Sequence, residues 1–92
     1  MGVARFRDNA DGSIVEAIQD TAENVFDIFE WVPRHRLRLT DMCGSPAMYL
    51  TTTGGGCERV FLNQWIIRRS EHDWGVVGAT YFAERFAVLG VS

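Results

Sequence analysis

The side chains that most often do chemistry in proteins are few in this 92-residue chain, and they are widely spaced. Its histidines are His35 and His72, and its cysteines are Cys43 and Cys57. Nucleophilic catalysis by a Cys–His pair requires the two side chains to meet, and no local signature surrounds either cysteine. Because neither cysteine belongs to a C-x-x-C motif, a zinc ribbon and a thioredoxin-type site are excluded.

Three other groups of residues resemble functional sites, and each has a simpler interpretation. Glu71–Asp73 are adjacent residues of a polar turn, so their side chains do not converge easily on one metal ion. Gly54–Gly56 lacks the Lys-Ser/Thr of a phosphate-binding loop and precedes a strand, which indicates a hairpin turn. Four carboxylates have the spacing of the solvated face of a helix: Asp20, Glu23, Asp27 and Glu30. We therefore expect no enzymatic activity, no metal site and no cofactor.

One cluster of tryptophan and arginine has the composition of a binding surface. All nine basic side chains are arginine, and Arg34, Arg36 and Arg38 follow shortly after Trp31. Tryptophan and arginine are the residues that most often dominate protein interfaces. We therefore predict a partner-binding site at Trp31, Arg34, Arg36 and Arg38. The alternative is that Trp31 is partly covered at the edge of a sheet and that the arginines are solvated.

Composition restricts the class of protein that carries these residues. Hydrophobic residues make up 47% of the chain and charged residues 23%, which is typical of a globular protein with a single domain spanning 1–92. No apolar stretch of about 18 residues is present, and no apolar run follows Met1. We therefore expect neither a membrane span nor a secretory signal. The net charge of −3 argues against binding to nucleic acid.

Charge is distributed unevenly along the chain. Residues 1–33 carry seven acids and two arginines, whereas residues 34–92 carry five acids and seven arginines. Such a distribution favours self-association or docking on a charged partner, and the alternative is a solvated surface. Without a secretory signal, we expect Cys43 and Cys57 to be reduced, buried thiols. A disulfide stays an open alternative if two strands place them opposite each other.

The pattern of apolar residues predicts an α+β fold. A main amphipathic helix is predicted over about 22–32, with a capping box at Asp20 and Glu23 and a stop at Pro33. Its apolar stripe is Ala22, Val25, Phe26, Ile28, Phe29 and Val32. Strands are predicted over 14–19, 37–40, 47–53, 58–62, 65–68 and 74–77, and a short C-terminal helix over about 80–86. Together they predict a small curled antiparallel sheet with the helices packed on a face.

Two segments resemble a family of small tailed-bacteriophage and prophage proteins. The first joins the strand Val15–Gln19 to a helix near Glu23 and is similar to the family's "VEAIQWTG" start, although Asp20 replaces the aromatic residue. The second runs from Gln64–Arg68 past Trp74 to Thr80–Phe86 and is similar to a "GDWIIRG-GEFYP-PDIFEATY" ending, without its Pro-Gly-Asp turn. The resemblance implies a phage origin and expression in the host bacterial cytoplasm. It implies no assigned activity.

These observations lead to one functional hypothesis and two alternatives. The first is a non-enzymatic phage accessory protein that binds and modulates a host bacterial protein, in host takeover, counter-defence or superinfection exclusion. The second is a binder of small nucleotide-type ligands, whose phosphates would be held by arginines. That clamp would consist of Arg36, Arg38, Arg68 and Arg69. The third is an oligomeric structural component, in which the acidic first third of one copy meets the basic remainder of another.

Overall fold

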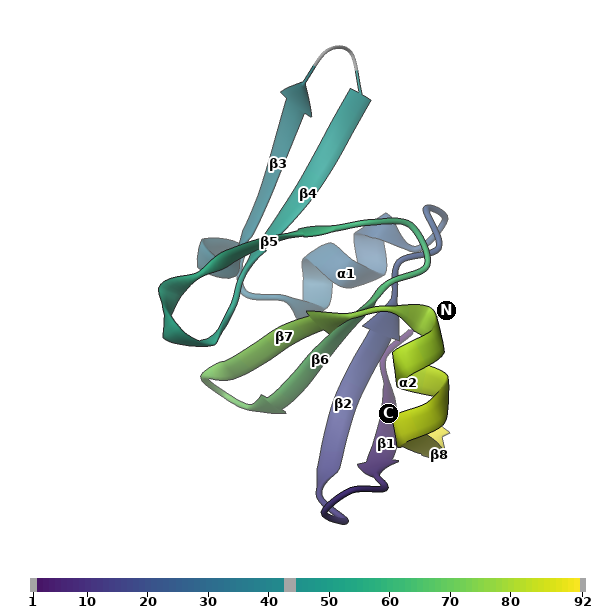
Figure 1. The fold of residues 1–92 in the computed structure, drawn as a ribbon. Coiled ribbons are helices and arrows are strands. Elements are labelled where there is room, and N and C mark those ends of the chain that lie inside the picture. Colours follow the sequence, from purple (N-terminus) through teal and green to yellow (C-terminus); the bar gives the residue numbers. More distant parts are fainter. Residues whose placement is uncertain (1, 43–44, 92) are drawn as a thin grey trace.

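The computed structural model describes residues 2–42 and 45–91 (Figure 1). The helices of this part are α1 (Val25–Trp31) and α2 (Ala79–Arg85), and η1 (Arg34–Arg36) and η2 (Thr53–Gly55) are 3-10 turns. Its strands are β1 (Ala4–Asp8), β2 (Ile14–Gln19), β3 (Leu37–Met42), β4 (Ser45–Thr51), β5 (Cys57–Val60), β6 (Trp65–Ser70), β7 (Asp73–Val77) and β8 (Phe86–Val91). All paired strands are antiparallel, which confirms the predicted α+β class.

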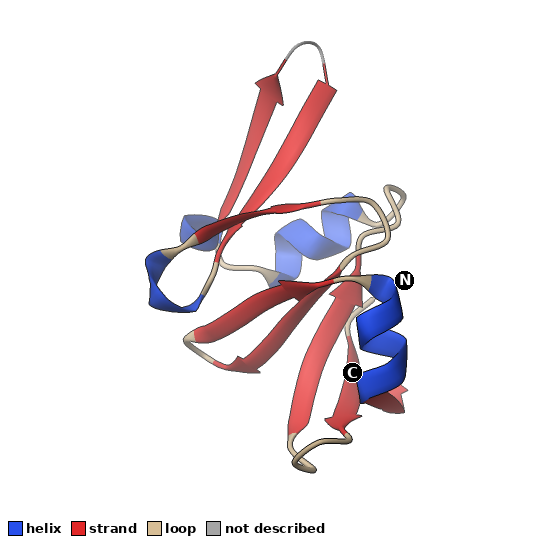
Figure 2. Cartoon of the chain, viewed as in Figure 1, coloured by secondary structure: helices blue, strands red, loops and turns tan. Residues whose placement is uncertain are grey.

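The strands form two sheets, so the prediction of one curled sheet is wrong. Five strands are ordered β7-β6-β2-β1-β8, and three are ordered β3-β4-β5. The break lies between β5 and β6, where Asn63 N donates to Asp20 O at 2.6 Å and Asp20 N donates to Gln64 O at 2.9 Å. These bonds fix the turn to the end of β2, so β6 pairs with β2 and not with β5. The β3–β4 hairpin extends away from the larger sheet (Figure 2).

The larger sheet lies between two hydrophobic clusters, because successive side chains of a strand point to opposite faces. On one face, Ile18 and Ile66 pack with Ile28 of α1 and with Leu50 of β4. On the other face, Ala17 and its neighbours pack beneath α2; the cluster is Phe6, Val15, Ala17, Ile67, Phe82 and Phe86. Helix α1 and the small sheet therefore cover one face, and α2 covers the other (Figure 1).

Helix α1 begins later than the sequence predicts. The segment after β2 is a turn in which Ala22 adopts a left-handed φ of 69°. Asp20 accepts a hydrogen bond from Ala22 N, and Asn24 accepts one from Thr21 N, so the predicted capping box does not form. Both α1 and α2 have seven residues, so neither is a dominant helix. In the predicted stripe only Ile28 and Val32 are buried.

Strands β1 and β8 were missing from the sequence prediction. In β1 the buried residues are Phe6 and Asp8, and a buried carboxylate hides the usual apolar alternation. The C-terminal helix is confirmed to within one residue, but Phe86 already belongs to β8. Strand β8 pairs with β1, which brings the two ends of the described chain together.

The glycine and cysteine predictions have different outcomes. Gly54–Gly56 connects β4 to β5 as expected, and Gly54 and Gly55 have φ values of 88° and 86° that suit glycine. Cys57 is exposed on β5, so the expectation that it is buried is wrong. An edge strand of the small sheet leaves its side chain uncovered. Cys43, and with it any pairing of the two cysteines, lies outside the described residues.

Candidate protein-binding site

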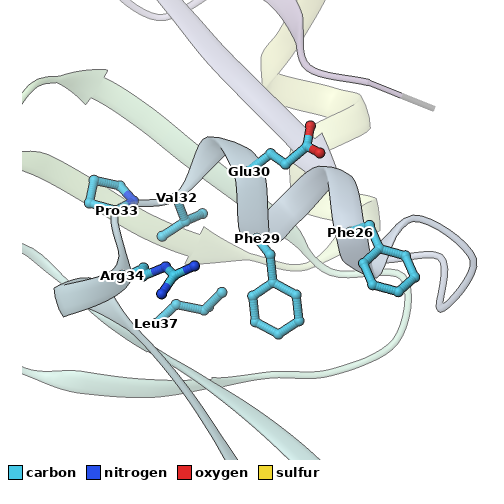
Figure 3. A pocket seen from close by; sticks show the side chains of 7 residues that line it. All are labelled: Phe26, Phe29, Glu30, Val32, Pro33, Arg34 and Leu37. Carbon is cyan, nitrogen blue, oxygen red and sulfur yellow. The ribbon is translucent and has the colours of Figure 1, made fainter.

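The chain leaves an open, largely apolar groove where α1, η1 and β3 meet (Figure 3). Its volume is about 800 Å³. The residues that line it are Phe26, Phe29, Glu30, Val32, Pro33, Arg34 and Leu37. Its size falls within the range of about 300–1,000 Å³ typical of ligand pockets. This surface is the candidate functional site, and we call it the α1 groove.

The geometry of the α1 groove follows from the end of the helix. Pro33 cannot continue the helix, and its backbone leaves α1 with φ −56° and ψ 139°. Val32 is buried and anchors this corner, and Arg36 N donates to Pro33 O at 2.9 Å to form η1. The chain then returns as β3, and Figure 3 shows Leu37 and Phe29 directed into the space between the two elements. The groove is therefore a consequence of a helix ended by proline.

Phe26 is the feature of this groove that core packing does not explain. This residue is 81% exposed, the largest exposed fraction among the large hydrophobic residues of the described chain. Phe29 beside it is half-buried. Leaving a phenylalanine in water forgoes about 1.5–3 kcal/mol of burial free energy. An exposed aromatic ring next to an apolar groove marks a surface that can gain this free energy by binding.

The two charged side chains at the rim of the groove point in different directions. Arg34 is exposed, and Figure 3 shows its guanidinium on the same side of α1 as Phe29 and Leu37. Glu30 also lines the groove, but its carboxylate points away from that side. Among the described residues Arg34 forms no ion pair. A carboxylate of a ligand can therefore meet Arg34 without displacing an internal partner.

The predicted site residues divide into two pairs. Trp31 is half-buried, and its ring packs against Trp74 with the centroids 5.0 Å apart. Arg36 lies 5.9 Å from the Trp74 ring and donates through Nη1 to Thr51 O at 3.1 Å. Trp31 and Arg36 thus hold the corner together, whereas Arg34 and Arg38 are exposed. Of the four predicted residues, Arg34 is the one that lines the groove.

The sequence did not predict that Phe26 and Phe29 line an open groove. Both belonged to the apolar stripe of the predicted helix and were expected in the core. The stripe is wider than the surface that the sheets offer to a seven-residue helix, so its outer members stay uncovered. The sequence held one signal of this: the stripe has more apolar residues than one face of so short a helix can bury.

A second cluster of charged residues is structural. The Asp8 carboxylate is fully buried and accepts hydrogen bonds from Arg85 Nε at 3.0 Å and from Arg69 Nη2 at 2.9 Å. Hydrogen bonds from Arg85, from the backbone of Ala10 and from Arg69 hold the pKa of Asp8 well below its usual range, although burial opposes this. Arg85 also bonds the Tyr81 hydroxyl. A buried carboxylate that stays ionised is a fixed acceptor and does not exchange protons near neutral pH.

These ion pairs also alter two other sequence interpretations. Arg68 Nη1 contacts Glu16 Oε1 at 2.7 Å, and Arg69 contacts Asp8, so two members of the predicted phosphate clamp already hold carboxylates. Both pairs join an acid of the first third of the chain to an arginine of the remainder. Strand pairing of β2 with β6 brings Glu16 opposite Arg68. The uneven charge along the sequence is therefore partly neutralised within one molecule.

No protein-family model, curated protein or solved structure matches this chain. No cluster of three or more histidine, cysteine or acidic side chains suited to a metal ion occurs among the described residues. In the same part of the chain, no helix is long and apolar enough to cross a membrane.

Proposed function

We propose that this chain is a non-enzymatic bacteriophage accessory protein that binds and modulates a host bacterial protein in the host cytoplasm. The observation that carries the proposal is the exposure of Phe26 beside the α1 groove. Arg34 supplies a charged contact at the same place. Aromatic and arginine side chains around a pocket are the usual composition of the residues that dominate binding. The phage origin is supported by the resemblance of the N- and C-terminal segments.

The partner surface that suits this groove is an apolar segment carrying a carboxylate. Phe26, Phe29 and Leu37 offer the apolar contacts, and Arg34 offers a two-pronged donor. Trp31 and Arg36 act by holding the α1–η1 corner in shape. A corner held in shape lowers the entropic cost of ordering the backbone on binding, so the cost that is left is the ordering of exposed side chains such as Phe26 and Arg34.

The proposal is tested by capturing host proteins from lysate and asking whether capture requires particular side chains of the α1 groove. The wild-type chain, Phe26→Ser and Arg34→Glu are used as bait. Ile14→Ser is the matched control, because Ile14 is also exposed, at 51%, but lies at the opposite end of β2 from the segment that leads to α1. We expect a host protein retained by the wild type and by Ile14→Ser, and lost with both groove variants. Capture that is the same for all four baits, or no captured protein and no effect on host growth, would overturn the proposal.

A further inference from the structure

The four outer strands of the two sheets, as far as the structure describes them, are protected to different degrees. Strands β7 and β8 border the larger sheet, and β3 and β5 border the smaller one. An edge strand presents unpaired N–H and C=O groups to any strand that approaches. Folded proteins suppress such pairing with charged residues, short edges or a covering segment.

Three of these edges are protected. The hydroxyl of Thr53 accepts a hydrogen bond from Trp74 N at 3.0 Å and donates to the Asp73 carboxylate at 2.8 Å, so η2 covers part of β7. Strand β5 has only four residues, and two of them are Glu58 and Arg59. Strand β3 carries the exposed charged side chain of Arg38. Each of these edges therefore has a recognised means of discouraging a partner strand.

Strand β8 has none of these protections. Its sequence is FAVLGV, with no charged residue and no proline. Val88 is 74% exposed and Leu89 is 51% exposed. Leu89 has no residue opposite it on β1, because Phe6 faces Val88 and Arg5 faces Gly90. A bulge often protects an edge, but here the bulged residue is apolar and exposed, which adds to the uncovered surface.

An apolar cavity continues from this edge under α2. Its volume is about 620 Å³, and its lining includes Ala4, Phe6, Trp65, Phe82 and Val88. Trp65 and Phe82 stack at 3.9 Å between ring centroids and form its inner wall. Val88 is the lining residue that is most exposed at the edge. The edge and the cavity are therefore one continuous apolar surface.

We propose that two copies of this chain associate through β8, with the two β8 strands antiparallel across a twofold axis. Such pairing extends the five-stranded sheet into one of ten strands. The twofold axis stands perpendicular to the joined sheet, so both α2 helices lie on the same side and the two cavities meet at the join. Val88 of each copy then faces the cavity of the other.

A second copy is the occupant that this edge fits best. A strand without charges meets no like-charge repulsion when it pairs with itself, and backbone hydrogen bonds need no matched sequence. The partner's apolar Val88 and Leu89 suit the apolar cavity, which contains no charged lining residue. The α1 groove lies on the other face of the larger sheet, so this association leaves the groove accessible.

The oligomeric state in solution tests this proposal. Sedimentation equilibrium is measured over a concentration series for the wild type, Val88→Lys, Leu89→Lys and the control Ile14→Lys. Each substitution occurs twice in a twofold dimer and replaces an apolar contact at the join with a charge, so it should raise the dimer dissociation constant by about tenfold or more. We expect a dimer for the wild type and the control, and a shift to monomer for both β8 variants. Circular dichroism and urea unfolding show whether the variants are folded.

Hydrogen–deuterium exchange then separates strand pairing from other contacts. The β8 peptide should become protected as the wild-type concentration rises, and this concentration dependence should vanish in Val88→Lys. A wild-type chain that stays monomeric, or a dimer that both β8 lysine variants leave intact, would overturn the proposal. Filaments that grow with concentration would also contradict it, because a twofold contact closes after two copies.

Discussion

The buried Asp8 carboxylate and the half-exposed Arg85 guanidinium, 77 residues apart, form an ion pair in which Nε lies 3.0 Å from Oδ1 and Nη2 lies 3.1 Å from Oδ2. The pair joins the end of β1 to the point where α2 becomes β8. Asn9 N donates to Arg85 O at 2.8 Å at the same junction. Charge-assisted bonds in two-pronged geometry are stronger than neutral ones. We infer that this pair fixes β8 against β1.

Replacing Asp8 with asparagine should lower stability and change its dependence on pH. In the folded chain the pKa of Asp8 lies well below its ordinary value of 3.8, because Arg85 and Arg69 stabilise the carboxylate. The stability that this carboxylate contributes is therefore complete above the ordinary value. It is lost as the pH falls from there toward the folded-state pKa.

Urea unfolding at a series of pH values checks this prediction. At neutral pH, Asp8→Asn should have a lower midpoint than the wild type. Between about pH 5 and pH 2 the difference should shrink as the wild type loses its contribution. A difference that is constant over this range would mean that the ionised carboxylate is not the source of the stability.

Replacing Ala22 with glycine should stabilise the chain. Ala22 has a φ of 69°, a conformation that costs an alanine about 1–2 kcal/mol and a glycine very little. The entropy of the unfolded glycine offsets part of this, so the expected gain in unfolding free energy is about 0.5–1 kcal/mol. If residue 22 were instead inside a helix, glycine would cost about 1 kcal/mol. A higher urea midpoint for Ala22→Gly therefore indicates a turn at this position, and a lower midpoint indicates a helix.

The start of α1 illustrates where sequence reasoning succeeded and where it failed. The apolar spacing and Pro33 located the helix and its end. The pattern of Asp20 and Glu23 also fitted a capping box, but the turn that ties Asp20 to Asn63 and Gln64 competes for the same backbone groups. That competition depends on residues more than 40 positions away, and local sequence carries no sign of it.

The residues of the α1 groove could be predicted only in part from the sequence, again because long-range packing decides which side chains are covered. Trp31 and Arg34 pointed to the corner of the fold at which the α1 groove lies, because tryptophan, proline and arginine follow one another closely there. Whether Trp31 faces water or Trp74 depends on where β7 lies, and whether Phe26 is covered depends on the extent of the small sheet. Both are properties of long-range packing. The pairing of β1 with β8 was not predicted, because the buried Asp8 interrupts the apolar pattern of β1. The arginines that bond to Asp8, Arg69 and Arg85, lie near the other end of the chain.

Trp31→Ala should reduce folding stability. The half-buried ring packs against Trp74 and the main hydrophobic cluster, so its removal leaves a gap there. Removing such a ring should lower the unfolding free energy by about 2–3 kcal/mol. Urea unfolding measures this directly. A variant with wild-type stability and altered binding alone would show that Trp31 belongs to the interface and not to the fold.

Phe26→Ala should leave stability nearly unchanged, within about 0.5 kcal/mol, because Phe26 is 81% exposed. Ile28→Ala is the matched control, since Ile28 lies on the same helix and is fully buried. It should cost about 2–5 kcal/mol. A large loss of stability for Phe26→Ala would mean that the ring supports the fold, which removes the reason to assign it to binding.

Photo-crosslinking from residue 26 in host cells tests the central claim most directly. A photoreactive benzoyl-phenylalanine replaces Phe26 in one culture and Ile14 in another, and both are irradiated during expression. The exposed ring beside the α1 groove predicts a discrete covalent adduct with a host protein from position 26, and its loss when Arg34→Glu is added. No adduct from position 26, or the same adduct from position 14, would contradict the assignment of the α1 groove as the binding site.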